Sequence, residues 1–186
     1  YKKLSMSKKN SSVILKEGFK NHKELFLIYS KFKEKLNNLK KNSLLIAVSG
    51  GPDSLALTAL SKAFSYQKKC KTYYVLIDHN LRKNSSKEAL SVKKLLKKYK
   101  INLTILKNKK LINRNIQSNA REIRYNLLTT FCKKKKIKTI LTAHNLEDQV
   151  ETFFIRLSRG SGLHGLSSMK QISKIDKNII LLRPLL

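Results

Sequence analysis

The sequence predicts an α/β fold in which a doubly wound, mostly parallel, Rossmann-like sheet carries helices on both faces. Two observations predict it. Short apolar runs alternate with longer amphipathic stretches, and the runs are rich in Ile, Leu and Val, as strands buried on both sides are. The 186 residues, 41% of them hydrophobic, suffice for one such domain with a core. Right-handed crossovers would gather ligands at the carboxyl ends of the strands.

The predicted elements follow a basic leader. Residues 1–43 hold 12 basic and 3 acidic side chains, and their apolar residues recur loosely at helical spacing, so we expect a mostly helical leader. Residues 44–186 form the predicted domain. Its strands are expected at Leu44–Val48, Tyr73–Ile77, Leu103–Leu106, Thr139–Thr142 and Ile179–Leu182. Its helices are expected at Ser54–Tyr66, Ser86–Tyr99, Gln117–Lys135 and Leu146–Leu157.

Charge is the unusual feature of the composition. Lys and Arg total 41 against 11 Asp and Glu, a formal net charge of +30. Residues 82–138 hold 19 basic side chains, with Glu88 and Glu122 as their two acids. A field this positive attracts polyanions and makes binding salt-dependent, so nucleic acid is the expected partner. An acidic membrane surface is the alternative, and an AT-rich genome would also enrich Lys, Asn and Ile.

The sequence favours a cytoplasmic protein without a membrane partner. No apolar run approaches the roughly 20 residues that a membrane helix needs, and residues 1–10 lack the pattern of a secretory signal. Cys70 and Cys132 are far apart and form no C-x-x-C pair, which argues against a disulfide framework or a cysteine zinc site.

A glycine-rich turn links the first predicted strand to a helix. Leu44–Val48 runs directly into Ser49-Gly50-Gly51-Pro52-Asp53-Ser54. The glycines let backbone N–H groups converge on a ligand, the helix directs its positive end at the same point, and the serines add hydroxyl donors. Asp53 can cap the helix or hold a Mg²⁺ that bridges phosphates. The run is neither a Walker A loop nor G-x-G-x-x-G, so neither γ-phosphate transfer nor a nicotinamide cofactor is indicated.

This turn resembles the PP-loop, or N-type, ATP pyrophosphatases. The resemblance implies that ATP phosphates sit on residues 49–54, that an acceptor attacks the α-phosphate, and that pyrophosphate leaves. Four further segments resemble the tRNA(Ile)-lysidine synthase family within that group, in the expected order. They are Leu76–Arg82, Asn119–Tyr125, Leu141–Thr152 and Arg156–Leu166.

The lysidine synthase resemblance implies a two-step reaction. The wobble cytidine of tRNA(Ile) with a CAU anticodon is adenylated at C2, and the ε-amine of L-lysine then displaces AMP. Members of that family continue beyond the segment Arg183–Leu186, so we expect the domain to be incomplete at its C-terminal end. The chain begins at Tyr1 rather than Met, which also suggests a fragment.

Further candidate site residues lie at a predicted strand end and on a predicted helix. Asp78 and His79 end the second strand, where they would hold the nucleotide's ribose or adenine; for His79 a simple strand-end cap is an equal alternative. Arg121 and Arg124 share a helix face, and they could neutralise phosphate or contact tRNA. We expect Arg121 to be catalytic, and Arg124 and Arg159 to contact tRNA.

His144, Asp148 and Glu151 form the most informative set. Their spacing of four and three places them on one helical face or its entry loop. Two carboxylates suit a cationic substrate, the family counterparts are associated with lysine recognition, and a nearby carboxylate would keep His144 available for proton transfer. Zinc held by His144 and the two acids, or a solvated acidic face, are the alternatives.

Other functions remain possible from these residues. A related PP-loop enzyme that thiolates tRNA shares the loop, although such enzymes commonly use C-x-x-C thiols. A non-catalytic basic RNA-binding protein would not need Asp53, Asp148 and Glu151, which repel RNA. A GMP- or NAD-synthetase-like enzyme would leave the net charge of +30 unexplained.

Overall fold

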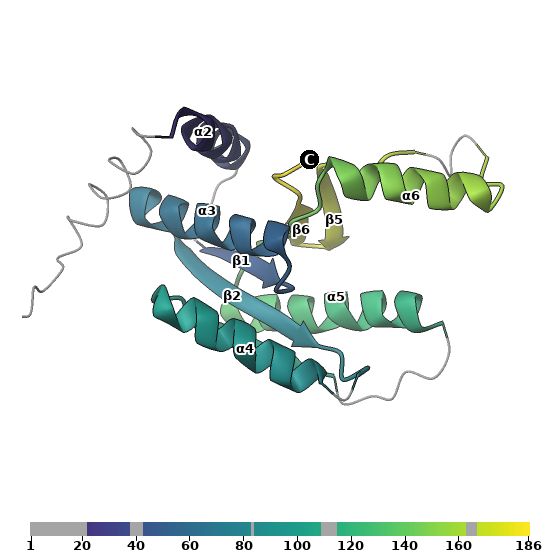
Figure 1. The fold of residues 1–186 in the computed structure, drawn as a ribbon, viewed down its shortest axis with the longest axis horizontal. Helices are drawn as coiled ribbons and strands as arrows, with labels where there is room; N and C mark the ends of the chain where they lie inside the picture. The colour runs from purple at the N-terminus through teal and green to yellow at the C-terminus, as the bar shows by residue number, and fades with distance from the viewer. Residues whose placement is uncertain (1–21, 38–42, 83, 109–114, 163–166) are drawn as a thin grey trace, which may run out of the picture.

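The computed structural model describes residues 22–37, 43–82, 84–108, 115–162 and 167–186. Six strands form one sheet in the order β3-β2-β1-β4-β6-β5 (Figure 1). The strands are β1 (Ser43–Val48), β2 (Lys71–Asp78), β3 (Leu103–Lys107), β4 (Thr139–Leu141), β5 (Ile172–Asp176) and β6 (Ile179–Leu182). The helices are α2 (Lys23–Asn37), α3 (Pro52–Lys68), α4 (Ser85–Lys98), α5 (Ile116–Lys135) and α6 (Leu146–Ser158). Every strand pair is parallel except β5 with β6.

The predicted doubly wound fold is confirmed, with a core on each face of the sheet. Side chains of β1 alternate between the faces, because successive residues of a strand point to opposite sides. Leu44, Ile46 and Val48 join a cluster with buried residues of α2, α3 and α4. Leu45 joins a second cluster with Leu128 and other residues of α5. In Figure 1, α3 and α5 accordingly lie on opposite sides of β1.

The chain reverses its direction of strand addition between β1 and β4. From β1 it adds β2 and then β3 on one side, and it then returns to place β4 on the other side of β1. In open α/β sheets a crevice forms at the carboxyl ends of the two strands at such a switch point. The loop after Val48 and the loop after Leu141 therefore lie side by side.

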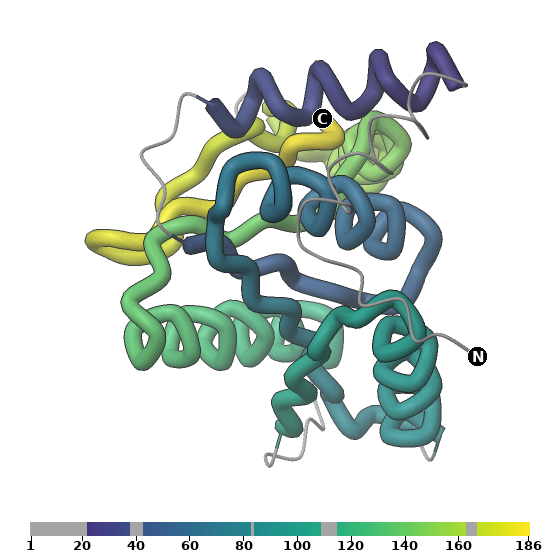
Figure 2. The backbone as a smooth tube through the Cα atoms, turned by 90° about the vertical axis from the view of Figure 1, so that its left-hand side faces the viewer, coloured from purple at the N-terminus to yellow at the C-terminus, as the bar shows by residue number. Residues whose placement is uncertain are grey.

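Two regions differ from the expected elements. Strand β5 was not predicted, and it pairs antiparallel with β6 at the edge of the sheet. In the leader, α2 buries Tyr29, Phe32 and Leu36 in the same cluster as α3, and Figure 2 shows α2 outermost over α3. Residues 1–21 and 38–42 of the leader lie outside the described residues, so its boundary at residue 43 stays a prediction. Among the described helices, none is both long and apolar enough to cross a membrane.

Candidate active site

The loop after β1 is a tight turn whose second position requires glycine. Gly50 has a φ of +94°, and a Cβ placed there would lie 2.8 Å from Cγ2 of Val92 on α4. The Ser49 amide donates a hydrogen bond of 2.8 Å to Oγ of Ser54, which closes the loop on the first turn of α3. Loop amides and the positive end of α3 thus face the same space, as a phosphate site requires.

Pro52 and Asp53 begin helix α3. Pro52 lies in the first turn, where a missing N–H leaves no helical hydrogen bond unmade. Asp53 is exposed and lines the pocket described below, and no hydrogen bond or ion pair within the described residues engages its carboxylate. That free carboxylate fits a Mg²⁺ ion, which typically takes one or two protein carboxylates and completes its ligands with phosphate oxygens and water.

A pocket of 380 Å³ opens at the switch point between β1 and β4. Its volume lies in the range of small-molecule sites. It joins the glycine loop to the ends of β2 and β4, the middle of α5 and the first turn of α6. The predicted site residues that line it are Ser49, Gly51, Asp53, Ser54, His79, Arg124, His144 and Asp148. Those outside its lining are Gly50, Pro52, Asp78, Arg121, Glu151 and Arg159.

At the end of β2, Asp78 and His79 have different surroundings. Asp78 is 3% exposed, and its carboxylate accepts hydrogen bonds from the Asn80 amide at 3.0 Å and from Ser86 Oγ at 2.6 Å. Burial alone would raise the pKa of Asp78, but these hydrogen bonds and the charge of Lys107 bring the net pKa below its ordinary value. The carboxylate ties the end of β2 to the start of α4, so its side chain shapes the turn beside the pocket.

His79 faces the pocket with one ring nitrogen unsatisfied. Its Nε2 lies 3.5 Å from Nε of Arg124, and its Nδ1 is buried and has no hydrogen-bond partner within the described residues. Burial lowers the pKa of His79, the charge of Arg124 lowers it further, and Asp78 opposes them. The lowered pKa favours the neutral ring, which lines the pocket beside Arg124.

Helix α5 forms one side of the pocket, and two of its arginines lie near it. Arg124 lines the pocket and contacts His79. Arg121 is exposed, and its guanidinium carbon lies 5.3 Å from the centre of the Tyr125 ring. The spacing of three places both arginines at the same end of α5, as the sequence predicts, and only Arg124 reaches the pocket lining.

The start of α6 presents His144 and Asp148 to the pocket. Asn145 caps the helix: its side chain accepts from the Asp148 amide at 3.0 Å, and its own amide donates to Oδ2 of Asp148 at 2.8 Å. One carboxylate oxygen of Asp148 thus serves the cap, and the other remains available to a ligand. Nδ1 of His144 lies 2.9 Å from Oγ1 of Thr142, which fixes the ring.

The electrostatic surroundings of His144 favour its neutral form. Burial is the largest cause that lowers its pKa, and the charge of Arg183 lowers it further. Asp148 raises the pKa in part, whereas Arg121 and Arg124 lower it. A histidine with a depressed pKa is unprotonated at neutral pH, so His144 can accept a proton there.

Glu151 and Arg159 lie further along α6. Both are exposed and neither lines the pocket. His144 precedes the helix instead of sharing its face, because α6 begins after the Asn145 cap. Within the described ranges no three His, Cys, Asp or Glu side chains are grouped closely enough to hold a metal ion, which leaves the zinc alternative without geometric support.

Sequence reasoning missed two residues beside the site. Tyr125 lines the pocket from α5, and Arg183 follows β6 and is only 5% exposed. Tyr125 was visible as the last residue of the A-R-E-I-R-Y run. Arg183 gave no signal, because an arginine near the end of a strand is normally solvated.

Curated relatives match most of this chain but only part of their own length. It is 40% identical over 148 residues to the tRNA(Ile)-lysidine synthase of Wolbachia sp. subsp. Brugia malayi, covering 78% of this chain and 34% of the relative. It is 43% identical over 143 residues to the tRNA(Ile)-lysidine synthase of Orientia tsutsugamushi, a match that covers 76% of this chain and 32% of the relative. It is 38% identical over 168 residues to the tRNA(Ile)-lysidine synthase of Rickettsia typhi, a match that covers 86% of this chain and 38% of the relative. The chain therefore spans about a third of the length of these relatives.

Solved structures share the fold at low sequence identity. The U34-tRNA thiolase NcsA from Methanococcus maripaludis superposes with a TM-score of 0.68 at 19% identity, covering 88% of this chain and 60% of the thiolase. The FMN adenylyltransferase of Candida glabrata superposes with a TM-score of 0.51 at 18% identity, covering 88% of this chain and 53% of the adenylyltransferase. At such identities the likeness extends to the fold alone.

The family follows from the sequence match and the architecture together. A profile of the PP-loop domain matches residues 26–186, which includes the glycine loop, all six strands and all of α2 after its first three residues. The resemblance predicted from the motifs is confirmed by the curated relatives. The chain belongs to the PP-loop domain family, and the tRNA(Ile)-lysidine synthases are among its relatives.

Proposed function

We propose that this chain is the ATP-dependent catalytic domain of a tRNA(Ile)-lysidine synthase. It would join L-lysine to the wobble cytidine of tRNA(Ile) with a CAU anticodon, giving lysidine, AMP and pyrophosphate, in the cytoplasm, where that tRNA is used. The observation that supports the proposal is that residues of the glycine loop, His144 and Asp148 line the same pocket. An ATP-activating loop and a proton acceptor with a carboxylate are the groups that the two steps need.

In the first step the oxygen on C2 of cytidine attacks the α-phosphorus of ATP, and the bond to pyrophosphate breaks. The loop at Ser49–Ser54 would hold the departing phosphates with backbone N–H groups. Asp53 would hold a Mg²⁺ ion, which would supply positive charge beside these phosphates. Arg121 and Arg124 would offset the negative charge that develops on the α-phosphate side.

In the second step the ε-amine of lysine attacks C2, and AMP leaves with the electrons of the C2–oxygen bond. The free carboxylate oxygen of Asp148 would hold the incoming ammonium. His144, neutral because its pKa is depressed, would accept the proton that the amine must lose. Glu151 would serve as a more distant attraction for lysine, since it is exposed outside the pocket lining.

The tRNA would approach the carboxyl end of the sheet and contact Arg159 on α6. The net charge of +30 supports binding of a polyanion. Affinity for tRNA should fall steeply with salt, because each neutralised phosphate releases counterions. A salt titration with a flat response would contradict this electrostatic contribution.

A sulfur-transfer function has less support. Cys70 and Cys132 are both buried, neither is in a disulfide, and neither lines the pocket. Burial raises the pKa of Cys132 to about 12, so its thiol stays protonated and unreactive at neutral pH. The described thiols therefore lack the exposure that sulfur transfer demands.

The test separates the two half-reactions. Asp53→Ala should abolish pyrophosphate release, whereas Asp148→Asn should still adenylate tRNA and should need far more lysine for transfer. Both variants are measured in the full-length protein for adenylated tRNA and for lysine incorporation. Unchanged pyrophosphate release in Asp53→Ala would show that the loop is not the ATP site. Wild-type lysine dependence in Asp148→Asn would remove Asp148 from lysine binding.

A further inference from the structure

His144 lines the pocket with one ring nitrogen engaged and the other open. Its Nδ1 lies 2.9 Å from Oγ1 of Thr142, and no described residue forms a hydrogen bond with its Nε2. Nε2 is not one of the buried polar atoms without a partner in the described part of the chain, so it is open to the pocket that the ring lines. The ring nitrogen of His144 that can meet a ligand is therefore Nε2.

The sheet holds Thr142 in place beside this ring. Thr142 directly follows β4 and is 6% exposed, and its amide donates a hydrogen bond of 3.1 Å to the Leu182 carbonyl of β6. A β-branched side chain on a fixed backbone has few rotamers, so Oγ1 has a defined place. The hydroxyl gives the ring of His144, two residues later, a fixed anchor.

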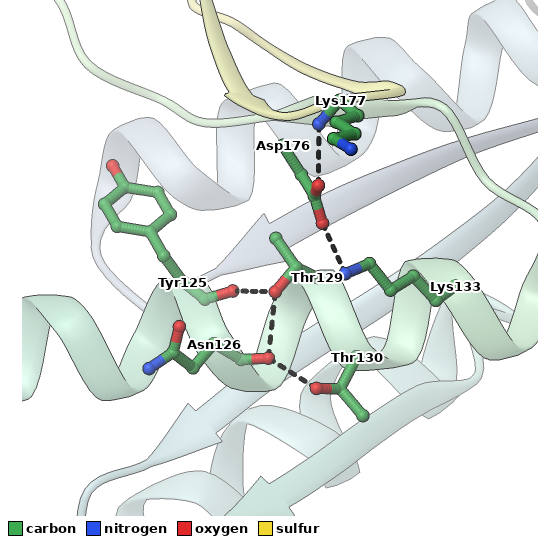
Figure 3. Close-up of polar contacts among 7 residues, drawn as sticks. All are labelled: Tyr125, Asn126, Thr129, Thr130, Lys133, Asp176 and Lys177. Carbon is green, nitrogen blue, oxygen red and sulfur yellow. Dashed lines mark hydrogen bonds and ion pairs between the residues drawn. The ribbon is translucent and has the colours of Figure 1, made fainter.

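Strand β6, which anchors Thr142, is itself held on both sides. It pairs with β4 and with β5. Asp176 of β5 forms an ion pair of 2.5 Å with Lys133 of α5, the helix that supplies Arg124 to the pocket lining (Figure 3). The strand behind Thr142 and the helix at the neighbouring side of the pocket are thus connected through the β5–β6 hairpin.

The direction of the hydrogen bond between Thr142 and His144 decides the chemistry of Nε2. A hydroxyl can donate or accept, and a neutral imidazole carries its hydrogen on one of its two nitrogens. If Oγ1 accepts from Nδ1–H, Nε2 presents a lone pair and can take a proton. If Oγ1 donates to Nδ1, Nε2 carries the hydrogen and can only donate. The first arrangement alone survives proton uptake without rotation of the hydroxyl, because an imidazolium ring donates from both nitrogens.

The charged surroundings of His144 also suit a lone pair on Nε2. The charged groups that act on the ring are Arg183 after β6, Arg121 and Arg124 of α5, and Asp148 of α6. Three of these four groups are guanidinium groups, which have donors and no acceptor. A lone pair on Nε2 is complementary to such neighbours, whereas a further N–H would face groups that cannot accept it.

We propose that Thr142 is the positioning residue of His144: Oγ1 accepts the hydrogen of Nδ1 and thereby leaves Nε2 as the proton acceptor in the pocket. The inference rests on the proposed function. As the nitrogen of the lysine amine bonds to C2 of cytidine, one of its hydrogens passes to Nε2 as a proton, and AMP leaves with the electrons of the C2–oxygen bond. The bond from Nδ1 to Oγ1 strengthens as the ring becomes charged, so Thr142 contributes most when the proton arrives.

The first measurement is nitrogen NMR of the 186-residue chain with isotope-labelled histidine, which reports which ring nitrogen carries hydrogen. The chain has four histidines, and His144→Gln assigns the signals of His144 by their loss. We expect hydrogen on Nδ1 in the neutral ring. Hydrogen on Nε2 would overturn the inference, because Thr142 would then donate and no lone pair would face the pocket. This measurement needs neither ATP, tRNA nor lysine.

The second measurement compares lysine incorporation by Thr142→Val, Thr142→Ser and Thr139→Val in the full-length protein. Thr139 is the matched control, because it begins β4, is 4% exposed and lies outside the pocket lining. Thr142→Val should lower kcat for lysine incorporation about tenfold, as the loss of one hydrogen bond does. It should leave KM for lysine and the formation of adenylated tRNA unchanged, because Asp148 and the glycine loop are intact.

The pH profile separates this role from a merely structural one. The lost hydrogen bond favours the charged ring, so Thr142→Val should lower the pKa of His144 further and move the acidic limb of the kcat profile to lower pH. Thr142→Ser keeps the hydroxyl and should restore both kcat and the profile, and Thr139→Val should change neither.

A wild-type kcat and an unmoved profile in Thr142→Val would overturn the positioning role. Equal losses in Thr142→Val and Thr139→Val would overturn it as well, because burial alone would then explain them. If the wild-type protein releases no pyrophosphate and incorporates no lysine, the proposed function fails and the role of Thr142 in it fails too. Wild-type incorporation with hydrogen on Nε2 of His144 would refute the inference alone.

Discussion

The two ends of the sheet differ in arginine: the described arginines lie towards the carboxyl end, together with Lys87 and Lys107, and the helix ends at the amino end carry lysines. The described arginines are Arg82 after β2, Arg121 and Arg124 in the first half of α5, Arg156 in the last turn of α6, Arg159 just after α6, and Arg183 after β6. At the amino end, where α3, α4 and α5 finish, the basic residues are lysines. They are Lys68, Lys69, Lys97, Lys98, Lys100 and Lys133–Lys136. Figure 1 shows α3 and α5 running back from the pocket end to this opposite end.

The two ends also differ in which non-glycine residues adopt positive φ: Asn80 and Asn115, at the carboxyl end, have φ of 54° and 44°, whereas those at the amino end are lysines. Lys69, Lys100 and Lys136 follow helices with φ of 51°, 56° and 56°, where glycine is the usual residue. Gly50, at the carboxyl end, keeps its glycine at φ +94°. We attribute these lysines to the lysine-rich composition of the chain, because a positive φ is unfavourable for a lysine. Arginine and glycine persist where a flat, forked cation or a bare backbone is required.

The strongest test exchanges the cations at both ends. Arg124→Lys should lower kcat/KM for lysine incorporation about ten- to hundredfold, because a charge-assisted hydrogen bond of roughly 1.5–3 kcal/mol is lost. Lys135→Arg, the matched exchange at the other end of α5, should stay within about twofold. Equal effects of the two exchanges would abolish the distinction between the ends.

Gly50→Ala tests the backbone requirement at the carboxyl end. We expect a loss of about 2 kcal/mol in the free energy of unfolding from the positive φ and the contact with Val92. Adding Val92→Ala to Gly50→Ala should restore the part of the unfolding free energy lost to the contact with Val92, and leave the part lost to the positive φ. Chemical denaturation of the single and double variants gives both values, and a stable Gly50→Ala protein would contradict the strained turn.

Glycine at the three lysine positions tests the amino end. Lys69→Gly, Lys100→Gly and Lys136→Gly should each stabilise the protein by about 0.5–1 kcal/mol, because glycine adopts φ near +55° without steric cost. For a chain of this size that gain raises Tm by roughly 1–4 °C. Lys97→Gly, inside α4, should destabilise instead, and thermal melts would show whether the signs differ.

The smallest expected effect is the pH dependence from His144. Its folded pKa lies below its ordinary value of 6.5, so the unfolded chain binds the proton more readily. Stability should therefore fall as pH drops through about 6.5 towards the folded pKa. His144→Gln should remove part of that fall between about pH 7 and 5, and His79, whose pKa is also lowered, should account for another part. Identical pH curves for wild type and His144→Gln would contradict the lowered pKa.

The sequence predicted the strands that are buried on both faces, but it did not predict β5, the strand at the edge of the sheet. Leu44–Val48 is a continuous apolar run, which matches β1 to within one residue. Strand β5 reads Ile-Ser-Lys-Ile-Asp and is mostly exposed or half-buried, so it carries little apolar signal. Its hydrogen bonds to β6 define it, and pairing between strands is not written in local composition.

The site was predictable where a motif names its residues consecutively. The loop at Ser49–Ser54 combines glycines and a helix start in six residues, and the structure places most of them at the pocket. Helical spacing alone misled for Glu151, because His144 lies before the Asn145 cap and the pocket meets only the first turn of α6. Arg183 is buried by its bonds to Lys170 and Ser173 of the segment that leads into and forms β5, which are tertiary contacts without a local sequence pattern.

Helix α6 buries none of its side chains, and Leu146 and Phe154 are 69% and 59% exposed. The described contacts that hold it include the Asn145 cap, the Gln149–Met169 bond and the Arg156–Ser167 bond. A helix with so little packing opens at a small fraction of the global free energy. Its amides should exchange with deuterium far sooner than those of β1. A ligand on Asp148 would slow this exchange, so part of its binding energy would be spent on ordering the helix.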